Sequence, residues 1–271
     1  MRPGICSLCL QSKDLVESHF VARSILKTLR EESGGNPNPV VTDAKIALQT
    51  SRQMKDELLC QECDNRFGQN GEEWVQANMY TTAGFQIREA LGRIAPVSQN
   101  PEHATYSVAS VPAIDMERIG YFALSLFWRA AVHSWRTAGS VSDPLEFGPY
   151  EEAMRRYLLG DDSFPQDIVL FVVVWHGDTP PRFVITPSEQ GYAPGEKRDF
   201  RAYVAYVPGI AFDLLIGKRI PEGLRQDCSY RNRLIHMNVH TDKGVINLVR
   251  LMNQMSRPSE KLKQFLQELR Q

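Results

Sequence analysis

The sequence has almost no excess of either charge, because 31 Lys and Arg residues are balanced by 32 Asp and Glu residues among 271. This balance excludes a uniformly basic nucleic-acid coat, although it is compatible with a local basic groove. The sequence also lacks an apolar run of about 20 residues, the length needed to span a bilayer. Its most hydrophobic stretch, 119–132, is shorter and contains Arg129. The N-terminus has no apolar stretch long enough for a secretory signal. We therefore expect a cytoplasmic protein without a membrane association.

Internal repeats and low-complexity segments are also lacking, and the C-terminal part has neither a Gly-rich phosphate loop nor a nucleophile motif. Hydrophobic residues make up 42% of the chain and charged residues 23%, which is typical of a folded protein. The polar, proline-bearing stretch 96–105 marks the best candidate boundary. We therefore predict an N-terminal zinc-binding domain over 1–95 and a second domain over 96–271.

The second part has the pattern of an α+β domain with a mainly antiparallel sheet. Helical periodicity indicates helices over 71–94, 115–137 and 146–160, with Asp115 as the N-cap of the second. Runs rich in β-branched and aromatic residues predict strands over 167–175, 181–186, 200–207, 210–217 and 233–240. Two further helical segments close the chain, the last of them starting near Pro258.

Cysteine is scarce but patterned. Cys6 and Cys9 form one Cys-x-x-Cys pair, Cys60 and Cys63 form a second, and Cys228 stands alone. Two such pairs supply the four thiolate ligands of a tetrahedral structural zinc site. A closed site of this kind has no open coordination position, so the zinc is expected to stabilise the fold and to do no chemistry.

The residues beside these pairs include candidates for catalysis. Glu17 and His19 follow the first pair, and Asp64 and Asn65 follow the second directly. The zinc would bring the two segments together. A histidine base next to oxygen ligands for a divalent cation such as Mg²⁺ is an arrangement suited to phosphodiester cleavage.

At these residues the chain resembles the HNH endonucleases, the zinc-bearing ββα-metal group. The resemblance rests on the order C-x-x-C, then S-H-F at Ser18, then L-L-C-x-x-C-D-N, within about the first 75 residues. It implies an HNH-like ββα-metal unit at the N-terminus, with His19 as the general base. It further implies Asp64, or Asn65 one place on, as a ligand of the catalytic metal. Glu17 is the second candidate ligand, because it adjoins Ser18, which stands where the family has an acidic ligand. Ser18, Lys55 and Asp64 differ from the residues typical of the family at those places.

Four basic residues near these segments are candidates for a phosphate-binding groove: Arg23, Lys27, Arg52 and Arg66. The resulting hypothesis is a metal-dependent endonuclease that cleaves DNA, and the resemblance suggests bacterial antiphage defence or a toxin as its context. Because the chain has almost no net charge, capture of DNA would be local or would depend on a protein partner.

The alternative hypothesis is a non-catalytic zinc-binding adaptor that binds nucleic acid or a partner protein. In that case His19 is a structural histidine and Asp64 caps a helix. Glu72 and Glu73 then act mainly as partners of a helix dipole, with metal ligation the less favoured role. Arg129, inside the apolar helix, needs a carboxylate or a carbonyl as its partner in either hypothesis.

Overall fold

The computed structural model describes residues 2–32, 40–42, 47–49, 54–136, 142–190 and 199–255. Its strands are β1 (Arg2–Ile5), β2 (Ser12–His19), β3 (Val40–Thr42), β4 (Ala47–Gln49), β5 (Lys55–Cys60), β6 (Ser98–Asn100), β7 (His103–Ser107), β8 (Ile168–Val174), β9 (Val184–Glu189), β10 (Arg201–Val207), β11 (Ile210–Ile216) and β12 (Leu234–Asn238). Its helices are α1 (Arg23–Glu32), α2 (Gln61–Phe67), the π-helical turn η1 (Gly68–Glu72), α3 (Glu73–Asn78), α4 (Gln86–Leu91), α5 (Met116–Val132), α6 (Pro149–Leu159), α7 (Glu222–Gln226), α8 (Ser229–Asn232) and α9 (Val239–Met255). The expected α+β class is confirmed.

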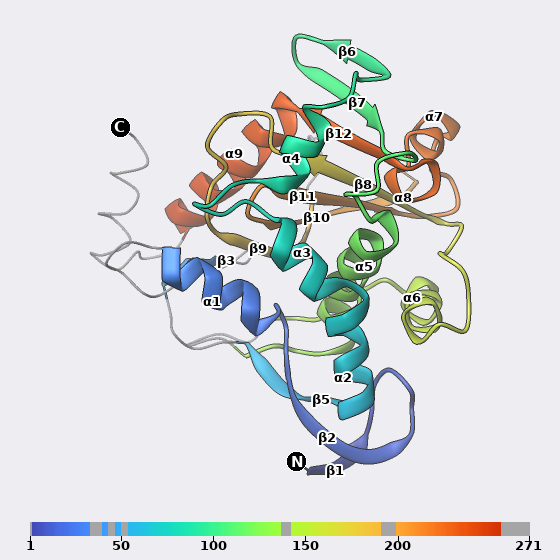
Figure 1. Ribbon diagram of the computed structural model, residues 1–271. Coiled ribbons are helices and arrows are strands. Elements are labelled where there is room, and N and C mark those ends of the chain that lie inside the picture. Colours follow the sequence, from blue (N-terminus) through green and yellow to red (C-terminus); the bar gives the residue numbers. More distant parts are fainter. Residues whose placement is uncertain are drawn as a thin grey trace.

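A small antiparallel sheet of order β1-β2-β5 lies at the end of the molecule that holds the N-terminus (Figure 1). The connection between β1 and β2 carries the first cysteine pair. Strand β5 runs directly into α2, whose first residues complete the second pair. Helix α2 packs on β2, so an antiparallel pair of strands is followed by a helix that covers it.

The large sheet has nine strands in the order β4-β3-β9-β10-β11-β8-β12-β7-β6. It is mixed but mostly antiparallel, because only the pairs β12–β8 and β3–β9 run parallel. Strands β10 and β11 form the expected hairpin, in which Val207 pairs with Ile210 across Pro208 and Gly209. Gly209 has a φ of 82°, a conformation that glycine adopts at no steric cost.

Both faces of this sheet are covered, which explains why its central strands are continuous apolar runs. Ile168, Leu170 and Val172 of β8 belong to the main hydrophobic core. Val173 faces the other way, into a second cluster with Val245 of α9. Alternate residues of one strand therefore serve two separate apolar layers.

Helix α5 occupies the centre of the molecule, between the large sheet and the helices beside the small sheet (Figure 1). It contacts β9 and β10 on one side and η1, α2 and α3 on another. Asp115 caps it as expected, because its carboxylate accepts a hydrogen bond from the Arg118 amide at 3.1 Å. Buried apolar side chains from both sides of the proposed boundary at residue 95 belong to one core, while the division into two domains stays a prediction.

Several segments differ from expectation. The helix predicted over 115–137 ends at Val132, and the strand predicted over 181–186 is β9, Val184–Glu189. The helix predicted over 71–94 is interrupted between α3 and α4, because the Tyr80 amide bonds to the Pro208 carbonyl at 2.9 Å instead of continuing the helix. The supposed boundary 96–105 contains the hairpin β6–β7, which extends the large sheet. The predicted final helix near Pro258 lies outside the described residues.

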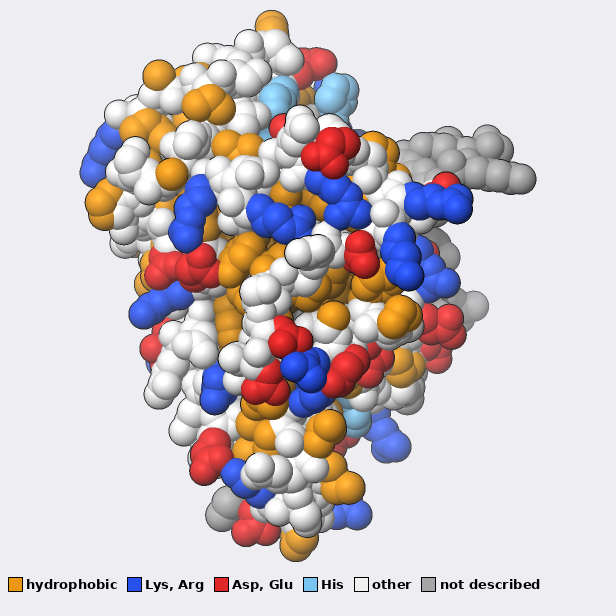
Figure 2. Space-filling model, turned by 90° about the vertical axis from the view of Figure 1, so that its right-hand side faces the viewer, with side chains coloured by type: hydrophobic (Ala, Val, Ile, Leu, Met, Phe, Trp, Pro, Cys, Tyr) orange, Lys and Arg blue, Asp and Glu red, His pale blue; other side chains and the backbone are white. Residues whose placement is uncertain are grey.

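Side chains of both charges are spread over the face in Figure 2, as the balanced composition implies, although Lys and Arg gather in a band across its upper half. Among the described residues, no helix combines the length and the apolar character needed to cross a membrane.

Candidate metal centre and adjoining cleft

The four paired cysteines meet at one point between the β1–β2 connection and the start of α2. The sulfur atoms of Cys6, Cys9, Cys60 and Cys63 all lie within 4.8 Å of one another. Cys6, Cys60 and Cys63 are buried, and none of the four is in a disulfide. This cluster is close enough to hold a metal ion, as the spacing predicted. Four sulfur ligands in a closed cluster fit the tetrahedral geometry of a structural zinc site.

Backbone hydrogen bonds hold the cysteines of the cluster in place. The Cys60 amide donates to the Cys6 sulfur at 3.3 Å, which favours a thiolate at Cys6. The hydrogen bond from the Cys63 thiol is the largest cause that lowers the pKa of Cys6, and the same contact raises the pKa of Cys63. The turn that holds Cys6 and Cys9 ends at Leu10, which has a φ of 59°. The Leu10 amide donates to the Cys6 carbonyl at 2.8 Å. Sulfurs so close together cannot all be charged unless a cation lies between them.

An open cleft of about 580 Å³ lies near this cluster. Its walls are the end of β2 with α1 on one side and the continuous helical segment α2–η1–α3 on the other, and α5 contributes its base. The lining residues are His19, Ala22, Arg23, Ser24, Lys27, Asp64, Gly68, Glu72, Glu73, Gln76 and Arg129. Cationic side chains of α1 therefore face carboxylates of the second wall across one cleft.

The helical wall presents its side chains at regular intervals. Asp64, Gly68, Glu72 and Gln76 are spaced by four residues and line the cleft together. The π-helical turn lies in the middle of this series, and such turns are frequent at functional sites. Gly71 faces the opposite way, where a Cβ atom would lie 2.8 Å from the Phe122 amide nitrogen of α5. Close packing of the wall against α5 therefore requires glycine at this position.

Arg129 fixes the two walls to each other at the base of the cleft. Its side chain is 2% exposed, and its guanidinium contacts the Glu72 carboxylate at 2.6 Å. It also donates to the Phe20 carbonyl, which follows His19, at 3.2 Å, and lies 4.5 Å from the centre of the Phe67 ring. The prediction that Arg129 needs a carboxylate or a carbonyl is confirmed, since it has one of each.

His19 and Asp64 both line the cleft, and so do Arg23 and Lys27. Strand β2 ends at His19, and Asp64 lies in the first turn of α2. Two segments separated by 45 residues (64 minus 19) thus contribute the predicted base and the predicted metal ligand to one cleft.

Other predicted site residues contact different partners. Glu17 forms an ion pair with Lys55 at 2.7 Å, and the Lys55 ammonium lowers the pKa of the Glu17 carboxyl. Asn65 accepts a hydrogen bond from the Gln61 side chain at 2.8 Å. Arg66 donates to the Leu159 carbonyl at 2.8 Å, at the end of α6. The described lining of the cleft includes none of these, and Arg52 lies outside the described residues.

Within the part of the chain that the structure describes, the four cysteines form the only group of three or more His, Cys, Asp or Glu side chains with ligand atoms within 4.8 Å. A cation in the cleft would therefore have few protein ligands. Mg²⁺ is commonly held in this way, by one or two carboxylates together with water and substrate phosphate.

The cleft also includes three residues that were not predicted to be part of a site, namely Ser24, Gln76 and Arg129. The only signal for Arg129 was a charge within an apolar helix. Gln76 lies four residues after Glu72 and twelve after Asp64, so a helical repeat of four residues would have indicated it. Comparison with protein-family models, curated proteins and solved structures found no match to this chain.

Proposed function

We propose that this chain is a metal-dependent endonuclease of the HNH type that cleaves DNA phosphodiester bonds. The observation that carries the proposal is the shared cleft, in which His19 and Asp64 lie together with Arg23 and Lys27. The antiparallel strands β2 and β5 followed by α2 support it, because a strand pair followed by a helix is the arrangement expected of a ββα-metal unit.

In this proposal each side chain has a defined task. His19 accepts the proton of the attacking water. Arg23 and Lys27 bind the phosphates that flank the cleaved bond. Asp64 holds a divalent cation, which when bound stabilises the negative charge that develops on the reacting phosphate. The Arg129–Glu72 pair keeps the wall that carries Asp64 at a fixed distance from the end of β2.

The test is cleavage of plasmid DNA in the presence of Mg²⁺, Mn²⁺ or Ni²⁺. We expect cutting by the wild-type protein and loss of cutting by His19→Ala and by Asp64→Asn. His240→Ala is the matched control, because His240 is an exposed histidine on α9 that does not line the cleft. Metal-dependent cutting that persists in His19→Ala would remove His19 as the base.

We also infer that the metal of the cysteine cluster is zinc and that it stabilises the fold. Elemental analysis of the purified protein should find one zinc per chain, and Cys60→Ser should lose it and unfold at a lower temperature. Cys228→Ser is the control, because Cys228 is also buried but lies outside the cluster. A protein that contains no metal and is as stable after chelation as before would contradict this inference.

The second candidate is a zinc-binding adaptor that binds nucleic acid or a partner protein without cleavage. The ion pair of Glu17 with Lys55 favours it, because the carboxylate closest to His19 in sequence is engaged away from the cleft. Glu72 is likewise engaged by Arg129. Binding of DNA without cutting in any metal, with or without cell extract, would favour the adaptor.

A further inference from the structure

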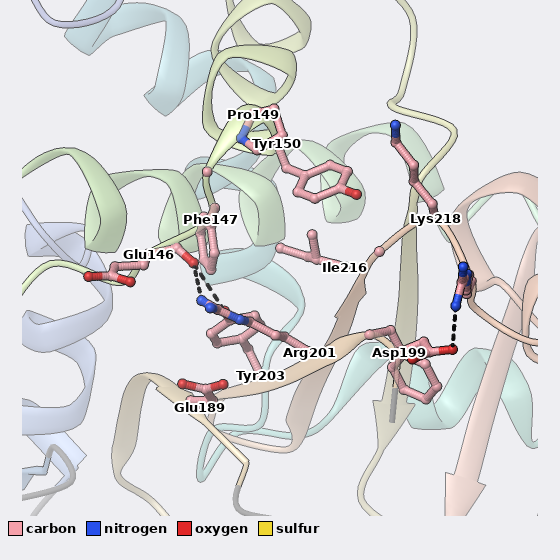
Figure 3. Close-up of a pocket in the computed structure, with 14 residues that line it drawn as sticks. Glu146, Phe147, Pro149, Tyr150, Glu189, Asp199, Arg201, Tyr203, Ile216 and Lys218 are labelled. Carbon is pink, nitrogen blue, oxygen red and sulfur yellow. Dashed lines mark hydrogen bonds and ion pairs between the residues drawn. The ribbon is translucent and has the colours of Figure 1, made fainter. Parts of the chain in front are cut away.

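A second pocket lies on the large sheet, at the end where α6 begins and β11 ends. Its volume is about 810 Å³, within the range of small-molecule sites in proteins, which is about 300–1,000 Å³. We call it the α6–β11 pocket. Its lining includes Phe147, Tyr150, Arg201, Tyr203, Ile216 and Lys218 (Figure 3). None of these residues belongs to the cleft described above.

The centre of the α6–β11 pocket is apolar and aromatic. Phe147 packs edge-on against Tyr203, with ring centres 4.8 Å apart, and Ile216 contributes an aliphatic surface. Figure 3 shows Tyr150 and Ile216 extending into the same part of the pocket. A flat ring buried against such side chains gains both apolar contact and stacking.

Carboxylates and cations are equal in number around the pocket, but they are not evenly placed. The Glu189 carboxylate lies on the Arg201 side, away from Lys218 (Figure 3). Arg219 pairs with Asp199 at 3.3 Å. Arg201 donates to the Glu146 carbonyl at 2.7 Å, and the Glu146 carboxylate points away from it (Figure 3). Within the described residues, the Lys218 ammonium forms no ion pair or hydrogen bond. A ligand with one negative group would therefore find a single available cation next to an aromatic surface.

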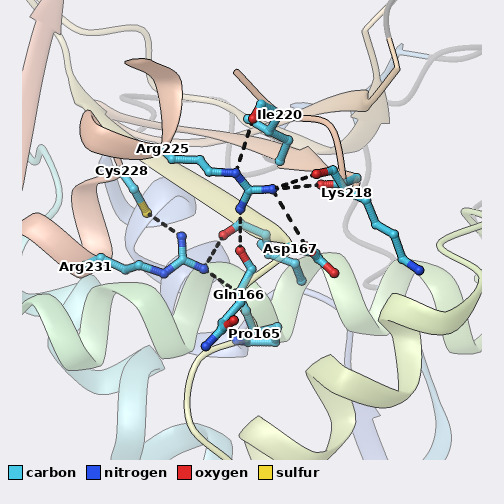
Figure 4. Close-up of polar contacts among 10 residues, drawn as sticks. Pro165, Gln166, Asp167, Lys218, Ile220, Arg225, Cys228 and Arg231 are labelled. Atoms are coloured by element: carbon cyan, nitrogen blue, oxygen red, sulfur yellow. Dashed lines mark hydrogen bonds and ion pairs between the residues drawn. The ribbon is translucent and has the colours of Figure 1, made fainter. Parts of the chain in front are cut away.

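The backbone that carries Lys218 is held in place by Arg225 (Figure 4). The Arg225 guanidinium donates to the Lys218 carbonyl at 3.2 Å and to the Gln166 carbonyl at 2.7 Å. It also contacts the Asp167 carboxylate at 3.7 Å. Figure 4 shows the Lys218 side chain extending away from this network. A fixed backbone reduces the entropy lost when the ammonium binds a ligand.

We propose that the α6–β11 pocket binds a mononucleotide unit, with the base against Tyr150, Phe147 and Ile216 and the phosphate at Lys218. Free mononucleotides and the 5′-phosphorylated end of a single strand share this chemistry. The proposal does not rest on the proposed endonuclease activity, because the pocket and the cleft have no residue in common.

Isothermal titration calorimetry of the full chain tests the proposal with four probes: 5′-mononucleotides, nucleosides, inorganic phosphate, and a short 5′-phosphorylated oligonucleotide. We expect the mononucleotide, the oligonucleotide or both to bind, and nucleosides and phosphate to bind at least tenfold more weakly. Whichever of the two binds more tightly identifies the source of the ligand.

Variants locate the binding. Lys218→Ala should weaken it about tenfold or more, the factor expected when one hydrogen bond to a charged group is lost. Tyr150→Leu should weaken it while keeping apolar volume. Lys243→Ala changes an exposed lysine of α9 and should leave the binding unchanged. Absence of binding by every nucleotide probe, equal binding of inorganic phosphate, or binding that Lys218→Ala does not change would overturn the proposal.

Discussion

Replacement of Arg129 by Met tests the role assigned to the buried ion pair. The change removes the partner of Glu72, whose side chain is only 15% exposed, and leaves the Phe20 carbonyl without its donor. Loss of one partner of a buried pair costs about 3–5 kcal/mol, because the remaining charge is left without compensation. Whole domains have free energies of unfolding of about 5–15 kcal/mol, so Arg129→Met should lower the stability of the fold severely. At about 2–4 °C per kcal/mol, the expected fall in Tm is roughly 10 °C.

A double-mutant cycle measured by urea unfolding separates the pair from its surroundings. Arg129→Met combined with Glu72→Met should cost less than the sum of the two single changes by about 2 kcal/mol, since the second change removes the stranded charge. Arg156→Met is the control, because its ion pair with Asp162 is exposed to solvent and should contribute little to stability. Single costs that add within about 0.5 kcal/mol would refute the role given to this pair.

Three further predictions concern other features of the fold. Gly71→Ala should destabilise the protein by about 1–3 kcal/mol in urea unfolding, because its Cβ would lie 2.8 Å from the Phe122 amide; an unchanged midpoint would contradict this close packing. Leu10→Gly should raise Tm by relieving a positive φ that costs roughly 1–2 kcal/mol, and a lower Tm would contradict it. Burial raises the pKa of the Asp213 carboxyl from 3.8 to about 6, because the fold disfavours its charged form. The stability that the neutral carboxyl contributes is therefore fully present below pH 4 and is lost as the pH rises through 6. The stability of Asp213→Asn relative to wild type should therefore increase over that interval, which urea unfolding at several pH values measures, and a difference independent of pH would contradict it.

Local patterns predicted much of the fold. The runs over 167–175, 200–207 and 210–217 became β8, β10 and β11 within a residue or two, because strands covered on both faces have few polar positions. The cysteine cluster was predictable because each pair closes within one turn of chain. Distant partners were not predictable. The interruption before α4 depends on the Pro208 carbonyl, which lies more than 120 residues after Tyr80.

The same limit applies to the cleft. The order of residues placed His19, Asp64, Arg23 and Lys27 near one another, and these four do line one cavity. The sequence predicted Arg66 for the same groove, but Arg66 donates instead to the Leu159 carbonyl in the last turn of α6. Which of several similar charges faces a cavity is decided by neighbours that are remote in sequence.

The pairing of β3 with β9 has a consequence for the order of events during synthesis. Val41 pairs with Val184, so this edge of the large sheet cannot form until 143 further residues (184 minus 41) have been made. Pairing over such a separation is slow, because a long loop must close before any contact forms. Strand β3 therefore leaves the ribosome long before its partner β9 has been made. Strands β3 and β4, which are made early, are therefore among the last to find their places in the large sheet.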